Sequence, residues 1–333
     1  MNQRCEEELR LKVLDGWRGV SILLVLASHL LPLGPSQWQL NWATGVMGMA
    51  IFFTLSGFLI TNFLLNRDSV VDFLLRRFFR IAPLAWLYMA TALFFMQSDA
   101  GHFLASFFFY ANWLPMWGDK AYGHLWSLCV EVQFYVAIAV LVVVLRRQWL
   151  FLIPLIGIAV TLYRVTNGVH VAIYTYYRID EILAGSMLAL IYNRRMGDVP
   201  ARILARMGQL PLLLLLAASC HPDSGFLNYF RPYLAASFVG ATLFNNKTRI
   251  ADAMDSRFLF YIATISYALY VVHPLLAETW LGSGEGILKY AKRPLLFCAV
   301  FLTAHISTFY YEMRWVALGK RLSRKWNGRF GEI

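Results

Sequence analysis

Apolar residues in this chain form long, unbroken runs, and short polar stretches separate these runs along nearly its whole length. A helix needs about 20 such residues to cross the hydrocarbon core of a bilayer. Strands of a membrane barrel would instead alternate apolar and polar residues over segments of about 10 residues. The pattern therefore predicts an all-α, polytopic membrane protein with ten spans, at about 16–33, 43–65, 79–97, 124–145, 149–165, 178–193, 208–220, 228–244, 258–280 and 294–312.

Basic residues gather in the short loops between the runs, and this distribution sets the predicted orientation. Cytoplasmic loops of membrane proteins carry an excess of lysine and arginine. With ten spans, most basic loops fall on the side of the N-terminus, so both termini are expected in the cytoplasm. The loop that carries Lys289, Lys292 and Arg293 falls on the other side and is the exception. The polar C-terminal tail is too short for a domain, so residues 1–333 are expected to form one membrane domain without a fused soluble domain.

Composition agrees with this class, because 59% of the residues are hydrophobic and 15% are charged. Soluble domains usually carry about 25% charged residues. The net charge of +11 is explained by the basic loops beside the spans, so no nucleic-acid partner is expected. The four cysteines have no metal-type spacing, and neither a disulfide framework nor a metal site is expected. The first apolar run has no small-residue cleavage site after it and is interpreted as a retained span rather than a signal peptide.

The predicted topology sorts the charged and titratable residues of the runs into two layers. The cytoplasmic layer holds Arg18, Arg76, Arg77, Arg80, Glu312 and Arg314. The outer layer holds His29, Glu131, Arg178, Asp180, Glu181 and His273. Ionisable groups inside a membrane are costly, so each of them is a candidate functional residue.

His29 lies in the outer half of the first span, eleven positions after Arg18. Eleven helical residues rise about 16 Å, roughly half of a hydrocarbon core. A neutral imidazole at this depth can accept a proton from a hydroxyl, because burial disfavours its charged form. The structural alternative is a packed and hydrogen-bonded core histidine.

Arg77 and Arg80 are three positions apart and therefore share a helix face. Arg80 is followed at once by Ile81-Ala82-Pro83, so it enters the membrane. Two guanidinium groups on one face, with Arg18 nearby, suit a polyanionic phosphate ligand. The alternative is a topology signal that also contacts anionic lipids.

Glu131 lies between two aromatic residues, Trp126 and Tyr135, near the outer end of a predicted span. Its carboxylate is a candidate for orienting an imidazole or a sugar hydroxyl, and structural pairing with an arginine is the alternative. The two aromatic side chains resemble either a carbohydrate-stacking wall or a membrane-interface belt.

Three further residues are candidates for contact with a substrate. Arg178 and Asp180 lie at the start of an apolar helix, where mutual pairing of their charges is the alternative. His273 precedes a proline, and a kinked helix with a hydrogen-bonded histidine would explain it as well. The small residues around Gly57 predict close helix packing rather than a nucleophile.

Taken together, these residues resemble the acyltransferase family 3 of integral membrane acyltransferases. The resemblance rests on an ordered set of motifs over almost the whole chain, and each motif alone is weak. The set comprises Leu14-Asp15-Gly16-Trp17-Arg18-Gly19 with His29, Phe52 to Ile60, Arg77-Phe78-Phe79-Arg80-Ile81-Ala82-Pro83, Trp126-Ser127-Leu128 with Glu131, Arg178 with Asp180 and Gly185, and Ser266-Tyr267 through His273. One departure is Val132, where a second acidic residue often follows the glutamate.

The resemblance implies ten transmembrane helices and transfer of an acyl group, usually acetyl, from a cytoplasmic acyl-CoA. Acceptors in this family are often sugar hydroxyls of cell-surface glycans. Catalysis is expected at the histidine matching His29. Donor-binding or structural roles are expected for the arginines matching Arg18, Arg77 and Arg80.

The expected function is therefore O-acetyl transfer in a bacterial inner membrane, from acetyl-CoA to an O-antigen, lipopolysaccharide or lipid-linked sugar, with membrane lipids around the protein. His29 would take a proton from the hydroxyl or would itself carry the acetyl group, and Glu131 would orient His29 or the acceptor. Contacts to the acceptor are expected from Trp126, Tyr135, Arg178, Asp180 and His273.

Two alternative functions remain at this point. One is acyl transfer to another acceptor, such as peptidoglycan, a small antibiotic or an amine. The other is a transporter or proton relay, which the lack of an internal inverted repeat in the sequence disfavours.

Overall fold

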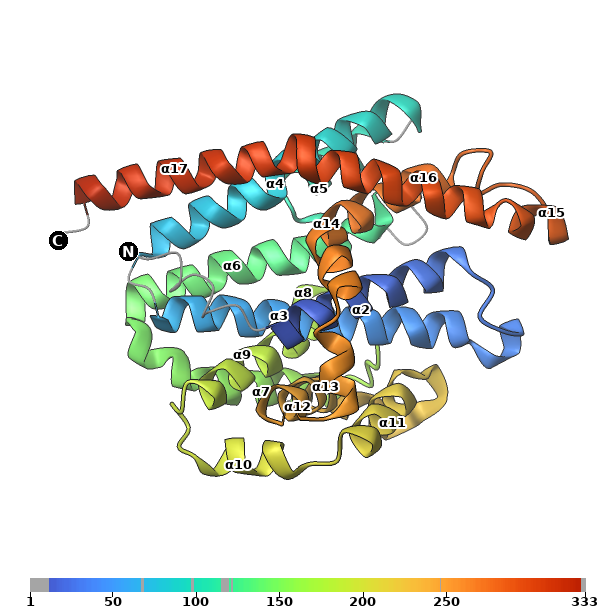
Figure 1. Cartoon of the computed structure of the whole chain (residues 1–333). Helices are drawn as coiled ribbons and strands as arrows, with labels where there is room; N and C mark the ends of the chain where they lie inside the picture. Colours follow the sequence, from blue (N-terminus) through green and yellow to red (C-terminus); the bar gives the residue numbers. More distant parts are fainter. Residues whose placement is uncertain are drawn as a thin grey trace.

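The computed structural model describes residues 12–66, 69–96, 99–114, 120, 122–245 and 247–330, and its regular elements in these ranges are helices (Figure 1). This confirms the predicted all-α class. The α-helices are α2 (Lys12–Leu30), α3 (Leu40–Asn66), α4 (Val70–Phe95), α5 (Ala100–Phe107), α6 (Trp126–Leu145), α7 (Ile153–Thr166), α8 (Thr175–Arg178), α9 (Asp180–Tyr192), α10 (Val199–Arg206), α11 (Gln209–Cys220), α12 (Arg231–Phe244), α13 (Arg249–Met254), α14 (Arg257–Ala277), α15 (Gly286–Ala291), α16 (Arg293–Ile306) and α17 (Met313–Phe330). Short 3-10 turns are η1 (Ser36–Trp38), η2 (Ala111–Trp113), η3 (Gly123–Leu125), η4 (Arg147–Leu152) and η5 (Pro222–Phe230), and a π-helical stretch, η6 (Ser307–Glu312), joins α16 to α17.

Six helical segments in the described ranges are long and apolar enough to cross a membrane, which fits a multi-pass membrane protein. They are Lys12–Leu30, Ser36–Asn66, Val70–Phe95, Gly123–Leu145, Arg257–Ala277 and Gly286–Trp326. The pair Val199–Arg206 and Gln209–Cys220 bends by 90° and makes a seventh candidate. The helices α9 and α12 occupy two more predicted spans but have only 13 and 14 residues. They rise about 20 Å, less than a hydrocarbon core of about 30 Å, so ten spans and cytoplasmic termini stay predictions.

Two of the long helices begin at serine caps that the sequence places just before an apolar run. The side chain of Ser69 accepts a hydrogen bond from the backbone N–H of Asp72 at 3.1 Å and starts α4. Ser256 caps α14 in the same way, through the backbone N–H of Leu259 at 3.3 Å. Such caps satisfy backbone donors that the first helical turn would otherwise leave unpaired.

The closest helix packing joins α3 to α9. A Cβ atom on Gly57 would lie 1.8 Å from the backbone oxygen of Ile182, and one on Gly185 would lie 2.0 Å from that of Thr54. The two backbones therefore touch at a pair of glycines, an arrangement that small residues permit between membrane helices. This confirms the close packing predicted around Gly57.

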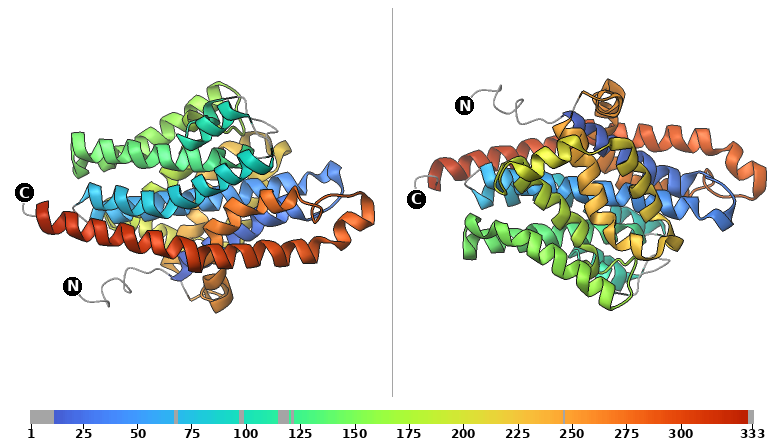
Figure 2. Two further views of the ribbon diagram at one scale, coloured as in Figure 1. Left: turned by 90° about the horizontal axis from the view of Figure 1, so that it is seen from above. Right: turned by 90° about the horizontal axis from the view of Figure 1, so that it is seen from below.

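The helices α2 and α14 lie against each other and run in the same direction. Gly19 packs against Leu259 near their beginnings, and His29 meets His273 near their ends. On another side of the molecule, α17 lies along α4 in the opposite direction (Figure 2), as the contact between Gly319 and Phe79 indicates. These two pairings determine which charged residues share a site.

Candidate functional site

Three cavities follow one another through the helices and share lining residues. The basic cavity is lined by Phe63, Phe73, Arg76, Arg77, Arg80, Val316 and Lys320. The central cavity shares Arg77 and Arg80 with it. The histidine cavity, which contains His29, shares Val25, Met49 and Tyr270 with the central cavity. The series connects the arginines that the sequence assigns to the cytoplasmic side with the histidine that it assigns to the outer half.

The basic cavity forms because α17 is fastened to α4. The buried carboxylate of Asp72 accepts a hydrogen bond from Arg76 Nε at 2.5 Å and another from the hydroxyl of Ser323. This contact holds Lys320 of α17 beside the arginines of α4. The predicted shared face of Arg77 and Arg80 is thus found on a cavity wall, and the structure adds a lysine that the sequence analysis did not select.

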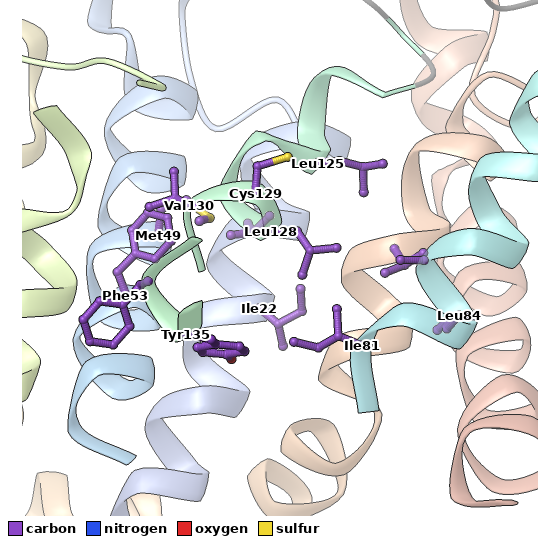
Figure 3. Close-up of a cluster of buried hydrophobic side chains, with 14 of the residues drawn as sticks. Ile22, Met49, Phe53, Ile81, Leu84, Leu125, Leu128, Cys129, Val130 and Tyr135 are labelled. Carbon is purple, nitrogen blue, oxygen red and sulfur yellow. The ribbon is translucent and has the colours of Figure 1, made fainter. Parts of the chain in front are cut away.

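The central cavity brings Arg18, Arg77 and Arg80 together with Glu131 and Tyr135. Apolar side chains complete its lining, and Figure 3 shows three of them, Ile22, Ile81 and Leu128, lying close together in the surrounding cluster. Long arginine side chains place their charged groups well away from their own backbones. Arginines from two different helices can therefore approach one deeply placed carboxylate.

Glu131 makes its hydrogen bonds within the central cavity. Its Oε1 atom accepts from the hydroxyl of Ser56 at 2.6 Å and from that of Tyr135. The structure therefore places Glu131 and Tyr135 beside the arginines, whereas His29 lines the next cavity. Val25, Met49 and Tyr270 form the wall between them, and the Tyr270 hydroxyl lies 2.6 Å from Ser127 Oγ.

His29 and His273 are hydrogen-bonded in the histidine cavity. His29 Nδ1 lies 2.8 Å from His273 Nε2, and His273 Nδ1 lies 3.0 Å from the backbone oxygen of Leu269. A carbonyl oxygen can only accept, so neutral His273 carries its proton on Nδ1 and its Nε2 accepts from His29. Neutral His29 then carries its proton on Nδ1 and keeps a lone pair on Nε2. This is the tautomer that a general base for a hydroxyl requires.

His273 is buried and lies behind His29, whereas His29 is exposed. The sequence predicts that His273 contacts the substrate. The structure places it where it can orient the ring of His29. Nothing in the spacing of the sequence indicates this pairing, because the two histidines are 244 positions apart.

Asn41 fixes the end of the helix that carries His29. Its Nδ2 donates to the backbone oxygens of Ser28 at 2.7 Å and Leu31 at 2.6 Å, and its Oδ1 accepts from the N–H of Leu33 at 3.2 Å. These bonds satisfy carbonyl groups that a helix end leaves unpaired. Asn41 was not selected from the sequence, because it lies at the start of a run whose pattern gives no sign of it.

Aromatic and basic side chains form part of the remaining wall of the histidine cavity. It includes Trp42, Trp126, His124 and Arg178, and the cavity volume is about 470 Å³. This is within the range of small-molecule sites. Trp126 and Arg178 were selected from the sequence and Trp42 and His124 were not, because they lie in or next to turns where no periodicity marks them.

Asp180 belongs to a buried ion cluster instead of an open surface. Arg164 Nη1 lies 2.5 Å from Asp180 Oδ2, and Arg231 Nε lies 2.7 Å from Glu181 Oε1. Glu181 also contacts Arg178 at 3.3 Å. Mutual pairing, the alternative considered for these charges, is thus found between Arg178 and Glu181, whereas Asp180, which is 1% exposed, pairs with Arg164. Arg164 and Arg231 were missed, although an arginine inside an apolar run is itself a signal.

Comparison with known proteins gives one family and several relatives. Residues 11–314 match a family model described as an acyltransferase domain. The chain is 25% identical over 359 residues to the peptidoglycan O-acetyltransferase OatA of Listeria monocytogenes, covering 90% of this chain and 54% of the relative. It is 25% identical over 307 residues to the O-acetyltransferase OatA of Staphylococcus aureus strain NCTC 8325, covering 78% and 49%.

A further Staphylococcus aureus protein, from strain COL, carries a provisional O-acetyltransferase name and is 27% identical over 306 residues. The match covers 78% of this chain and 49% of that protein. The chain therefore spans about half the length of the curated relatives it matches. No solved structure matches it.

Proposed function

Because this chain belongs to the acyltransferase domain family and is an acyl-transferring membrane enzyme, we propose that it moves an acetyl group from cytoplasmic acetyl-CoA to a cell-surface glycan. The acceptor hydroxyl would be reached from the outer side of a bacterial inner membrane. The observation that carries this proposal is the series of three cavities, which joins a basic entrance to a histidine.

The basic cavity fits the phosphates of the donor. Arg76, Arg77, Arg80 and Lys320 line it, and guanidinium groups bind phosphate oxygens through paired, charge-assisted hydrogen bonds. The central cavity has a volume of about 70 Å³, so its apolar walls of Ile22, Ile81 and Leu128 would have to move apart to admit the narrow pantetheine arm. The thioester would then reach the wall formed by Val25, Met49 and Tyr270, which a small side-chain movement would open.

His29 is placed to take the proton of the acceptor hydroxyl. In direct transfer, the hydroxyl oxygen bonds to the acetyl carbon, the carbon–sulfur bond breaks, and His29 Nε2 takes the hydroxyl proton and returns it to the thiolate. In a two-step route, His29 Nε2 bonds to the acetyl carbon and the carbon–sulfur bond breaks, which releases the CoA thiolate. The hydroxyl oxygen then bonds to the acetyl carbon, the carbon–nitrogen bond breaks, and the hydroxyl proton passes to the thiolate. The lone pair that His273 leaves on His29 Nε2 serves both routes, and an acetyl-protein trapped without acceptor would identify the second.

The acceptor is proposed to be a glycan because Trp42 and Trp126 line the histidine cavity beside His29. Their rings offer apolar faces for a sugar ring, with hydrogen-bonding groups close by. An O-antigen, lipopolysaccharide or lipid-linked sugar is the first candidate. Peptidoglycan is the second, and the name of the Listeria relative favours it.

The decisive experiment compares surface glycans from cells with and without the gene by mass spectrometry. The expected result is a loss of one acetyl group from one sugar when the gene is deleted. The same glycan should be acetylated by the purified protein in nanodiscs with acetyl-CoA, and CoA should be released in equal amount. Flux of a solute without consumption of acetyl-CoA would support a transporter instead.

A further inference from the structure

Arg178 is a buried cation, and two of its three guanidinium nitrogens have no hydrogen-bond partner among the described residues. Its guanidinium lies 5.5 Å from the ring centre of Trp126 and 5.8 Å from that of Phe53. Its Nε and Nη1 atoms make no hydrogen bond within the described part of the chain, and its side chain is 3% exposed. The residue lines the histidine cavity. Buried guanidinium donors without partners are rare, because burying a charge is costly unless it is paired.

The ion cluster around Arg178 has more cations than carboxylates. It contains Arg164, Arg178 and Arg231 against Asp180 and Glu181. Arg164 holds Asp180 at 2.5 Å and Arg231 holds Glu181 at 2.7 Å, whereas Arg178 has a 3.3 Å contact to the already paired Glu181. The uncompensated positive charge therefore resides on Arg178, the member of the cluster that faces the cavity.

We propose that the acceptor carries one carboxylate or phosphate group, which pairs with Arg178 while its hydroxyl lies at His29. This inference rests on the proposed function, because it assumes that the histidine cavity receives the acceptor. A phosphate of the acetyl donor is a poorer candidate for the group that pairs with Arg178. The basic cavity, at the other end of the series of cavities, supplies cations for that phosphate. An acidic group would supply the missing charge, and Trp42 and Trp126 would contact the adjoining sugar ring.

The transfer experiment uses pairs of soluble acceptors that differ in charge. The first pair is N-acetylmuramic acid and its methyl ester, and the second is N-acetylglucosamine 1-phosphate and methyl N-acetylglucosaminide. Full-length protein in nanodiscs is expected to favour the charged member of the accepted pair by roughly tenfold or more in kcat/KM, because the uncharged one leaves a buried guanidinium unpaired. Arg178→Gln should remove this preference by raising KM for the charged acceptor, and Arg178→Lys should keep part of it.

A matched control variant is Lys292→Gln, which removes a half-buried cation that lies over the Trp280 ring, far from this cluster in sequence. It should leave the charge preference unchanged. Equal transfer to both members of a pair, or an equal loss on both in Arg178→Gln, would overturn the anionic acceptor and leave the acetyltransferase proposal standing.

If none of these sugars is acetylated, a binding experiment tests whether Arg178 binds an anion. Inorganic phosphate should raise the thermal unfolding midpoint of Arg77→Ala, in which the basic cavity is weakened, and this rise should be smaller in the double variant Arg77→Ala/Arg178→Gln. This result would support the anion site even if the proposed reaction failed. An equal rise in the single and the double variant, or no rise in Arg77→Ala, would refute the site.

Discussion

His273 accepts a hydrogen bond from His29 and cannot donate one to it while neutral, because the Leu269 carbonyl holds its other ring nitrogen. The protein backbone therefore determines, through His273, which nitrogen of His29 is free. Because a backbone carbonyl does not change its protonation state, the Leu269 carbonyl keeps the proton of neutral His273 on Nδ1. Replacement of either histidine would break this hydrogen-bonded series of His29, His273 and the Leu269 carbonyl.

Replacement of His29 removes the proposed base. His29→Ala should lower kcat by about 10²–10⁴-fold, which is the usual contribution of a positioned general base. The thermal unfolding midpoint should change little, because His29 is exposed in its cavity. Near wild-type transfer by a well-folded His29→Ala protein would remove His29 from the mechanism.

Replacement of His273 should act through His29 and not through the acceptor. His273→Leu removes the nitrogen that accepts the hydrogen bond from His29 Nδ1–H. It should lower kcat by roughly 10–100-fold with little change in KM for the glycan. His273→Gln supplies a side-chain oxygen and should restore part of the rate. The pH profile of kcat should shift in His273→Leu. A rise in KM alone would instead indicate the substrate contact expected from the sequence.

The arginines of α4 are expected to bind the donor. Arg77→Ala and Arg80→Ala should each raise KM for acetyl-CoA by roughly tenfold, the usual cost of losing a hydrogen bond to a charged group. Arg202→Ala is a suitable control, because Arg202 is an exposed arginine on α10. An unchanged donor dependence in both α4 variants would exclude these arginines from the donor site.

The glycine contact between α3 and α9 should be sensitive to a single methyl group. Gly57→Ala and Gly185→Ala would each place a Cβ within about 2 Å of a backbone oxygen, and overpacking of this kind costs about 1–3 kcal/mol or more. Gly157→Ala is the matched control, since its Cβ would lie 3.4 Å from Leu183 Cβ. The thermal unfolding midpoint in detergent should fall for Gly57→Ala and Gly185→Ala and should stay near the wild-type value for Gly157→Ala. Equal midpoints in all three would contradict the contact.

The sequence pattern predicts the helical class and the grouping of Arg18, Arg77 and Arg80, because both follow from periodicity and charge. It does not predict the pairings between helices. Arg164 at the end of α7 lies beside Asp180 at the start of α9. The Asp180 carboxylate, for which the sequence predicts a substrate contact, is therefore already paired with Arg164. The pattern does place α9 and α12 to within three residues of the predicted spans 178–193 and 228–244, because polar residues follow these helices at Asn193 and Asn245.

The parallel packing of α2 and α14 gives Gly19, near the beginning of α2, an unexpected importance. Gly19 allows the backbones to meet at Leu259, and the two histidines meet ten positions further along α2, about 15 Å away. Sliding one helix by a single residue would displace an imidazole by about 1.5 Å, enough to break a 2.8 Å hydrogen bond. The alignment of the His29 ring, the proposed base, is thus fixed at Gly19, and a bulkier residue at position 19 should impair the proposed chemistry without touching a substrate.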